Sequence, residues 1–395
     1  MPRWCVATIS ARARLPEARV IAASLRRHHP EVPCVVLLAD EPDAGGVAVG
    51  EDVEVLVAAD LGIPGFRRLA FRCEREELSY ALTPHLLRHL LRREEVDAVL
   101  FLKQESLVIG DLTGLAAPPG GAGIVLTPHL TGPLDGADAL ERERLISCSG
   151  IYNGGVLGVT SREPGPAFLD WWAARIGDLC VNDVPAGLHF EQRWLDLVPA
   201  LFDPVEIVRE PVANVGHWNM TEHAVALEGD TVTVDGRPGR VVRFSGHDPT
   251  RPDRVTRHRE HPTRAAIGGA AAVLDRYDEA LLAAGHAEAQ RAPYAFAQFA
   301  DGVPIPPIAR TIHRELGDGA DRFGDPFATG PGTFRAWLAE PLGEGPQVTR
   351  LWDLIWRRRP DLQAAMPDHL GADRAALAAW PSTSGREEYG VSDAF

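Results

Sequence analysis

The feature of this sequence that most constrains its fold is a series of short apolar runs separated by segments with helical periodicity. Runs of strand length occur in residues 4–10 (WCVATIS), 32–40 (VPCVVLLAD), 53–61 (VEVLVAADL) and 96–102 (VDAVLFL). The segment from Pro16 to about His29 is amphipathic. Strands that are apolar throughout are typical of parallel sheets built from βαβ units, because both of their faces are buried. The sequence therefore predicts an α/β fold with a mostly parallel sheet flanked by helices.

Later segments continue this pattern and then change in character. Further strands are predicted within residues 123–130, 148–161 and 205–220, and helices within 77–93, 165–179 and 190–202. An Asp-Gly pair at residues 235–236 lies between alternating residues and predicts a hairpin. After about His261 the patterns are helical, with many Pro and Gly loops. We predict an α/β domain over residues 1–262, a helical C-terminal region over 263–385 and a flexible tail over 386–395.

Composition excludes several classes of function. The chain has 395 residues, of which 45% are hydrophobic and 24% charged, so it can bury a substantial core. Its formal net charge of −15 disfavours a nucleic acid or an anionic membrane as a partner. An anionic ligand would need a local cluster of cationic side chains. We found no signal peptide and no apolar run of about 20 residues, so we expect a cytoplasmic protein without a membrane span.

Lys103 is the only lysine of the chain. It follows the apolar run of residues 96–102, at the tip of a predicted strand, where open α/β sheets bind ligands. The excess of Ala, Arg, Gly and Pro is typical of a GC-rich genome, so Lys103 can be interpreted as a surface lysine that survived. The other interpretation is functional, because an ammonium is a compact point charge that suits an anion.

Four further segments carry polar residues between the predicted elements: YNGG at 152–155, EQ at 191–192, NVGHWN at 214–219 and FSGHDP at 244–249. With the strand tip, they resemble bacterial nucleotide-sugar glycosyltransferases of the GT-A fold, of the glycogenin and galactosyltransferase type. The resemblance covers about residues 4–260. It implies a Rossmann-like catalytic domain that transfers a hexosyl or pentosyl group from a nucleoside-diphosphate sugar to an acceptor. It also implies retention of the anomeric configuration.

In that family the strand tip carries an Asp-X-Asp motif that holds a divalent metal, usually manganese. Here Lys103, Gln104 and Glu105 stand in its place. One glutamate beside an ammonium is a poor cage for a hard cation. The charge of the donor's diphosphate must still be neutralised as it leaves. We therefore expect no metal and no other cofactor, with Lys103 replacing the metal and all three residues contacting the donor.

The resemblance assigns roles to two more segments. Glu191 and Gln192 match an acid–amide pair beside the donor sugar, and with Lys103 they are the catalytic candidates. Their alternative interpretation is a solvated first turn of a helix. Asn153, Gly154 and Gly155 match a segment where the backbone approaches the sugar. A bulge or turn within a strand is the alternative there.

The other donor-binding candidates lie in loops and at the first strand. They are Ala7, Thr8, Asn214, His217, Asn219, Ser245, Gly246, His247 and Arg257. The last segment departs from the family's His-X-Gly-X-X-Lys-Pro motif, because it lacks the lysine and its histidine follows the glycine. Arg251, Arg254, Arg257 and His258 come soon after and could hold phosphate oxygens instead. A lone histidine is more often structural than a ligand.

Two other functions fit the sequence. A non-catalytic protein could keep the sugar-nucleotide pocket without turnover. An interaction protein could use Trp352 and Trp356, which are spaced i, i+4, although such a pair also suits core packing.

Overall fold

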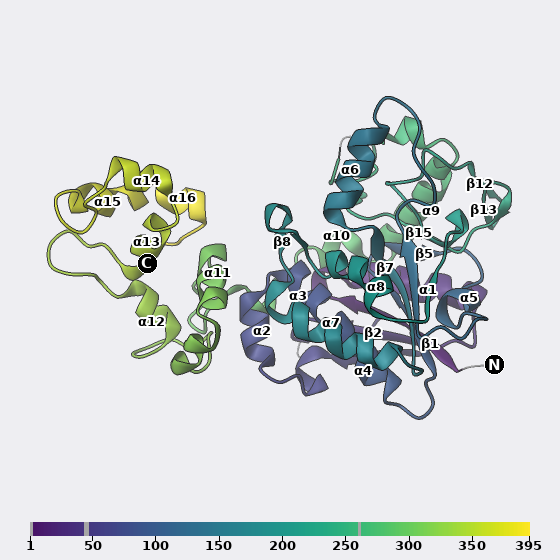
Figure 1. Cartoon of the computed structure of the whole chain (residues 1–395), viewed down its shortest axis with the longest axis horizontal. Coiled ribbons are helices and arrows are strands. Elements are labelled where there is room, and N and C mark those ends of the chain that lie inside the picture. Colours follow the sequence, from purple (N-terminus) through teal and green to yellow (C-terminus); the bar gives the residue numbers. More distant parts are fainter. Residues whose placement is uncertain (1–2, 43–46, 260–261) are drawn as a thin grey trace. The chain divides into compact units, whose positions relative to one another are not determined.

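The structure is a computed structural model that describes residues 3–42, 47–259 and 262–395. The chain forms two compact units (Figure 1). Unit 1 contains the residues up to Ile63 and Glu76–Tyr294, and unit 2 contains Pro64–Arg75 and Ala295–Phe395.

Unit 1 is built on a seven-stranded sheet with the strand order β10-β6-β7-β4-β1-β2-β3. The strands are β1 (Trp4–Ser10), β2 (Cys34–Leu38), β3 (Val53–Val57), β4 (Ala98–Leu102), β6 (Ile124–Pro128), β7 (Tyr152–Thr160) and β10 (Val205–Ile207). β7 is antiparallel to its two neighbours, β4 and β6, and all other pairs are parallel. Six strands therefore run in one direction, which confirms the predicted mostly parallel sheet.

Helices cover both faces of this sheet. On one face lie α4 (Thr83–Leu91) and α7 (Gly165–Leu179), which contact each other. On the other face α1 (Leu15–His28) and α5 (Thr113–Ala116) share a core with β1, β2, β4 and β7 (Figure 1). Because both faces are covered, every residue of β2 and β4 is buried. The predicted helix over 77–93 is split into α3 (Arg75–Ala81) and α4, with Pro84 in the first turn of α4.

A second core of unit 1 lies beside the main sheet. It contains two small sheets and the helix that follows them: β5 (Ser106–Val108), β11 (Val215–Gly216) and β15 (Val241–Arg243); β12 (Val225–Glu228), β13 (Thr231–Val234) and β14 (Arg237–Pro238); and α9 (Ala270–Ala283). The predicted hairpin is confirmed between β13 and β14, where Asp235 (φ 51°) and Gly236 (φ 73°) both have the positive φ that a type I′ turn requires.

Residues after 262 contribute to this second core. Val273, Leu274 and Tyr277 of α9 are buried against Val232 and Phe244. α10 (His286–Ala289) follows and contacts α1. The first unit therefore extends to Tyr294, beyond the boundary at residue 262 that we expected from the change in sequence pattern. The other short elements of unit 1 are α6 (Ala139–Ser149), β8 (Asn182–Asp183), β9 (Leu188–His189) and α8 (Val198–Leu201).

Unit 2 is helical and is assembled from two separate parts of the chain. Its helices are α2 (Phe66–Arg72), α11 (Pro307–Glu315), α12 (Phe334–Ala339), α13 (Arg350–Trp356), α14 (Pro360–Ala365), α15 (Arg374–Trp380) and α16 (Arg386–Tyr389). Phe71 of α2 is fully buried among the rings of Phe299, His313, Phe327 and Phe334. An early segment of the sequence thus supplies the centre of the C-terminal core.

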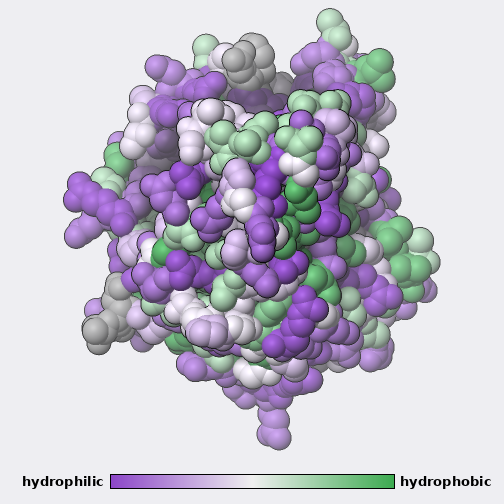
Figure 2. All heavy atoms as spheres, turned by 90° about the vertical axis from the view of Figure 1, so that its left-hand side faces the viewer, coloured by the Kyte–Doolittle hydropathy of each residue, from purple (hydrophilic) through white to green (hydrophobic). Residues whose placement is uncertain are grey.

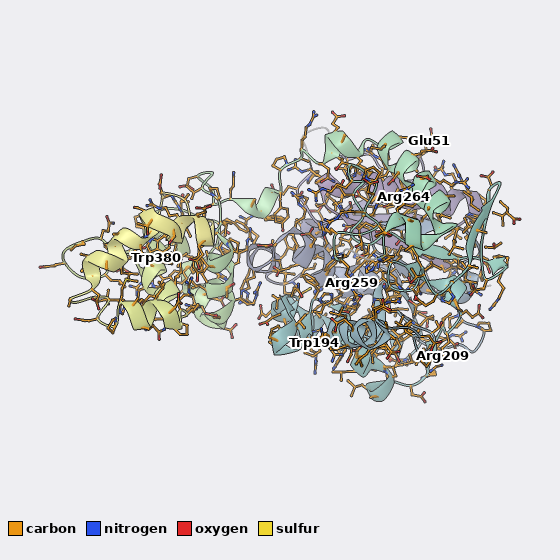
Figure 3. All side chains as sticks on the ribbon, turned by 90° about the horizontal axis from the view of Figure 1, so that it is seen from above. Glu51, Trp194, Arg209, Arg259, Arg264 and Trp380 are labelled. Atoms are coloured by element: carbon orange, nitrogen blue, oxygen red, sulfur yellow. The ribbon has the colours of Figure 1, made fainter. Side chains whose placement is uncertain are left out.

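The end of the chain is packed into unit 2. Trp352 is 2% exposed, donates a hydrogen bond to the carbonyl of Phe395 (3.1 Å) and contacts the ring of Trp380 (Figure 3). Trp356 stacks on His369. Both tryptophans therefore pack within unit 2. Residues 386–395, which we expected to form a flexible tail, contain α16 and the buried Phe395.

Figure 2 shows one face of the molecule, and hydrophilic side chains cover most of it. Among the described residues, no helix combines the length and the apolar character that crossing a membrane requires.

Candidate active site

The candidate site lies at the C-terminal end of β4, and its centre is an ion pair. Lys103 follows the last residue of β4, and its ammonium pairs with the carboxylate of Glu191. The Lys103 side chain is 12% exposed and that of Glu191 is completely buried. The ammonium also lies over the ring of Tyr80, 3.7 Å from its centroid. Burial lowers the pKa of Lys103; Glu191 opposes this effect and Arg243 adds to it. The structure thus joins two of the three predicted catalytic residues.

The other two residues of the Lys-Gln-Glu segment point elsewhere. The Gln104 amide donates a 2.6 Å hydrogen bond to the carbonyl of Ile9 in β1. Glu105 has a positive φ of 65°, and its carboxylate pairs with Arg14. Burial alone would raise the pKa of Glu105, but Arg14 and Arg243 outweigh it and hold the value below the ordinary range. The two side chains therefore bind protein groups from β1 and the turn after it.

Arg243, the last residue of β15, lies beneath this segment and was missed in the sequence. It is 4% exposed, and its guanidinium donates to the Gln104 carbonyl (3.1 Å), Ser106 Oγ (3.3 Å) and Asn153 Oδ1 (3.0 Å). Burial lowers its pKa, and Glu105 opposes the shift. The signal in the sequence was a single charge within the apolar run VVRF.

The predicted glycine segment in β7 lies against these charged side chains. A Cβ built on Gly154 would be 2.5 Å from Glu191 Oε1, and one built on Gly155 would be 1.9 Å from Arg243 Nη1. Asn153 accepts from Arg243, and its amide donates to His129 Nε2 (3.0 Å). The two glycines therefore make room for Glu191 and Arg243. The segment lies within β7, but the pairing of β7 with β6 changes register between Leu157 and Tyr152, so the strand is irregular here, as the alternative interpretation of a bulge predicted.

Gln192 holds the same strand through its side-chain amide. Its Oε1 accepts from the backbone N–H of Gly154 (3.0 Å), and its Nε2 donates to the carbonyl of Ser149 (2.9 Å). The predicted helix from Phe190 is a 3₁₀ helix over Gln192–Leu197, followed by α8. Its Trp194 contacts the ring of Trp171 (Figure 3). Neither Glu191 nor Gln192 lies in a solvated turn, because they are 0% and 8% exposed.

Histidines with lowered pKa values lie around the charged side chains of Lys103, Glu191 and Arg243. Burial lowers the pKa of His129 to about 3 and that of His189 to about 4, where Lys103 adds to the effect. Burial also lowers the pKa of His217 far below its ordinary value, and His258 contributes. His217 Nδ1 is a buried atom without a hydrogen-bond partner in the described part of the chain.

Several predicted donor-binding residues are buried within the protein. Ala7 and Thr8 lie within β1 and are fully buried. Asn214 donates to Thr127 Oγ1 (3.3 Å). Asn219 donates to the carbonyls of His129 and Asn214 (3.2 Å each). These two asparagines hold the loop around β11 together.

The FSGHDP segment forms a loop above the end of β15. Gly246 has a φ of 74°, and a Cβ there would lie 2.6 Å from the ring of His258. The carbonyl of Ser245 accepts from Thr256 Oγ1 (2.8 Å). His247 contacts Asp278 of α9 through Nε2 (2.6 Å) and the carbonyl of Arg254 through Nδ1 (3.1 Å). The loop is therefore fixed to the second core through α9.

A basic cavity opens beside this loop. Its volume is about 440 Å³, and its lining includes Arg14, Arg251, Arg254, Arg257 and His286. Arg14 also pairs with Glu105, so the cavity adjoins the Lys-Gln-Glu segment. Arg257, one of the predicted donor-binding residues, is exposed here and lies 3.5 Å from Glu76. Arg14 is a second residue that the sequence reasoning missed.

The side chains of the site do not fit the divalent metal that the resemblance implies. Glu105, the remaining carboxylate of the motif, pairs with Arg14, and His247 contacts Asp278. The ammonium of Lys103 lies in the Lys-Gln-Glu segment, and the guanidinium groups of Arg14 and Arg243 contact that segment. These positive charges repel a cation. Across residues 3–42, 47–259 and 262–395, no three His, Cys, Asp or Glu side chains come together as metal ligands would.

Comparisons with known proteins give distant similarities. No protein-family model matches the sequence. A segment of 99 residues, 25% of the chain, is 33% identical to YfnF, an uncharacterised protein of Bacillus subtilis (strain 168), and spans 33% of that protein. This chain thus matches about a third of the length of that relative.

Three similar solved structures are glycosyltransferases. The galactosyltransferase LgtC, in complex with donor and acceptor sugar analogues, is 14% identical with a TM-score of 0.42 over 70% of this chain and 95% of that one. GlyE of Streptococcus pneumoniae is 17% identical, with a TM-score of 0.33 over 53% and 46% of the two chains. WbbM, a bifunctional enzyme, is 12% identical, with a TM-score of 0.39 over 63% and 47%.

Proposed function

We propose that the protein is a glycosyltransferase that moves a hexosyl or pentosyl group from a nucleoside-diphosphate sugar to an acceptor. The observation that carries this proposal is the juxtaposition, at the C-terminal end of β4, of the Lys103–Glu191 pair with an arginine-lined cavity. The pair comes from segments whose sequences resemble glycosyltransferase motifs, and one such segment, FSGHDP, contributes Gly246, His247 and Asp248 to the lining of the cavity. Open α/β sheets bind their ligands at this edge.

The cavity suits the diphosphate of the donor. Its lining contains Arg14, Arg251, Arg254 and Arg257, and among the described residues Asp248 is the one carboxylate that lines it. In a chain with a net charge of −15, such a local cluster favours a small anion over a large one. Its volume of about 440 Å³ lies within the range of small-molecule sites, about 300–1,000 Å³. A guanidinium group can donate two parallel N–H hydrogen bonds to two oxygens of one phosphate.

The sugar would lie between this cavity and Glu191. Asn153, Gly154 and Gly155 border that position, and Glu191 is buried behind them with Lys103. The ammonium of Lys103 can move between the carboxylate and a phosphate oxygen, because its stem is flexible. Gln192 keeps the strand in place through Gly154.

The reaction breaks the bond between the anomeric carbon and the diphosphate and forms a bond from the same carbon to the acceptor oxygen. The acceptor hydroxyl loses its proton to a phosphate oxygen, and the nucleoside diphosphate leaves. Retention places the new bond on the face from which the diphosphate departs. The guanidinium and ammonium groups stabilise the charge that builds on the leaving group. In this proposal no metal or cofactor takes part.

The direct test is a thermal-shift panel of nucleoside diphosphates and nucleotide sugars, with EDTA and with manganese. A ligand that binds the native state raises the melting temperature by mass action. We expect one nucleotide sugar to stabilise the protein in EDTA and then to be hydrolysed slowly or transferred. No shift with any nucleotide would refute the proposal.

A second candidate is a sugar-nucleotide-binding protein without turnover. It is favoured by the engagement of Lys103 with Glu191 and of the Gln192 amide with two backbone groups, which leaves these side chains committed to the protein. Donor hydrolysis separates the two candidates, since such a protein binds the donor and leaves it intact.

A further inference from the structure

We infer that the guanidinium of Arg243 is a built-in cation that performs the electrostatic task which the family resemblance gives to a divalent metal. This inference rests on the proposed function, because it concerns the diphosphate of the same ligand. The residues at the position of the metal-binding motif do not suit a metal, because Lys103 is itself a cation and Glu105 pairs with Arg14.

The contacts of Arg243 place its charge between the end of β4, the start of β5 and β7. Its three hydrogen bonds reach the Gln104 carbonyl after β4, Ser106 at the start of β5 and Asn153 in β7. Each acceptor comes from a different strand or turn that borders the proposed donor position. The guanidinium therefore holds the strand tip and the glycine segment together from below.

All three acceptors are neutral, so no hydrogen bond joins the guanidinium of Arg243 to an anion, although Glu105 and Glu191 are close enough to favour its charge. Among the described residues, no carboxylate lies within ion-pair distance of its guanidinium. The nearby carboxylates of Glu105 and Glu191 form ion pairs with Arg14 and Lys103. Burying an unpaired cation is costly. A diphosphate bound above the layer would supply the missing negative charge, whereas a metal ion would add to the positive one.

Gly155 leaves the space that the guanidinium of Arg243 occupies. A methyl group at residue 155 would be 1.9 Å from Nη1 and 2.2 Å from Cζ of Arg243. Glycine at 155 is therefore matched to arginine at 243. The guanidinium is 4% exposed, so Arg243 acts as a positioning residue through its field and through Asn153 and the Gln104 carbonyl.

The test measures the binding of inorganic pyrophosphate in EDTA by calorimetry to the full chain and three variants. Arg243→Met should lower the affinity about tenfold or more, since it removes a buried positive charge beside the end of β4, where the dielectric is low. Arg243→Lys keeps the charge and should retain most of the affinity. Arg237→Met is the matched control, because Arg237 lies on the neighbouring hairpin with its side chain 58% exposed. It should bind as the parent does.

A merely structural role for Arg243 would weaken folding without this dependence on charge, so Arg243→Lys and Arg243→Met would then lose affinity alike. If Arg243→Met does not fold, Gly155→Ala gives the second measurement, because its methyl group must displace the guanidinium. Unchanged pyrophosphate affinity in the folded variant would overturn the inference. Pyrophosphate binding by the parent only with manganese would also overturn it; glycosyl transfer could then still occur, but with a metal, so only the metal independence of the proposed function would fail with it. Conversely, charge-dependent pyrophosphate binding without any response to nucleotide sugars would refute the proposed function alone.

Discussion

The ammonium of Lys103 and the carboxylate of Glu191 form an ion pair in which the carboxylate is completely buried. The sequence assigned the lysine to a diphosphate and the glutamate to a sugar, and in the structure each is the other's partner. A phosphate that binds Lys103 must therefore compete with Glu191. The pair also ties the end of β4 to the segment after β9.

Breaking this pair should destabilise unit 1. Lys103→Met leaves a buried carboxylate without its cation, and we expect a loss of about 3–5 kcal/mol in the free energy of unfolding. Lys103→Met combined with Glu191→Gln should cost less than the sum of the two single changes, because neither charge remains. Urea denaturation of the four proteins measures the coupling. Strictly additive costs would mean that the pair contributes nothing.

Gly154→Ala should disturb the same pair from β7. The added methyl group would lie 2.5 Å from Glu191 Oε1, so the carboxylate must shift. We expect destabilisation by about 1–3 kcal/mol, as for other overpacked sites. The matched control is Gly177→Ala in α7, where a Cβ has no atom within 4 Å. That change should stabilise the helix by up to about 1 kcal/mol. Equal effects at both positions would contradict the close approach at Gly154.

Removing divalent metals should leave ligand binding unchanged. Because Glu105 and His247 contact Arg14 and Asp278, neither is available as a metal ligand. The thermal shift produced by the best nucleotide sugar should therefore be the same in EDTA and in manganese. A shift that appears only with manganese would show that these contacts rearrange around a metal.

The stability of unit 1 should depend on pH through Glu17. Burial raises the pKa of Glu17 from its ordinary value to about 7, although Arg14 opposes the shift. His286, Tyr277 and Glu105 also surround it. Between about pH 4.5 and pH 7 the native state keeps a proton that the unfolded chain has lost. Raising the pH through this window therefore destabilises the parent protein.

Glu17→Gln removes this titration, so the two proteins should differ more at pH 8 than at pH 5. The parent should lose about 1.4 kcal/mol relative to the variant for each unit by which the two pKa values differ. Denaturation curves of both proteins at the two pH values give the change. A difference that is constant with pH would place the pKa of Glu17 near its ordinary value.

Phe71→Ala should unfold unit 2 more readily. Phe71 is fully buried within four other rings, and truncating such a side chain costs about 3–5 kcal/mol. Phe323→Ala is the control, because Phe323 is only partly buried in the same unit. Limited proteolysis followed by mass spectrometry should show faster cleavage after residue 295 in Phe71→Ala. Equal cleavage in both variants would contradict the central place of Phe71.

Most of the main sheet could be predicted because its strands are buried on both faces. β2 and β4 lie within the continuous apolar runs, and α7 spans the predicted residues 165–179. The Asp235–Gly236 turn was predictable from local backbone preference. The antiparallel direction of β7 was not, because an apolar run has the same composition in either direction. The division between the units was also missed, since the pattern of α9 is helical whether it packs on a sheet or on other helices.

The site was predictable as a set of segments and less so as a set of contacts. Lys103, Glu191 and the glycines of β7 do meet, as the motifs indicated. The partners of Gln104 and Glu105 depend on how β1 and its following turn approach β4, which no local pattern contains. Arg243 was overlooked because a single charge in an apolar run does not indicate by itself that the side chain is buried and hydrogen-bonded. Ala7 and Thr8 followed from the resemblance alone, and both lie fully buried within β1.

Unit 2 takes its central phenylalanine from residues 64–75 and the rest from residues 295–395. On the ribosome, the segment with Phe71 must wait for more than two hundred further residues, on the order of 10–40 s at ordinary rates of synthesis. During that interval Leu69 and Phe71 of α2, which are buried in the finished protein, have no partners within their own unit. We therefore expect the nascent chain to need a chaperone at this stage, and expression to depend on chaperone supply more than the stability of the finished protein would indicate.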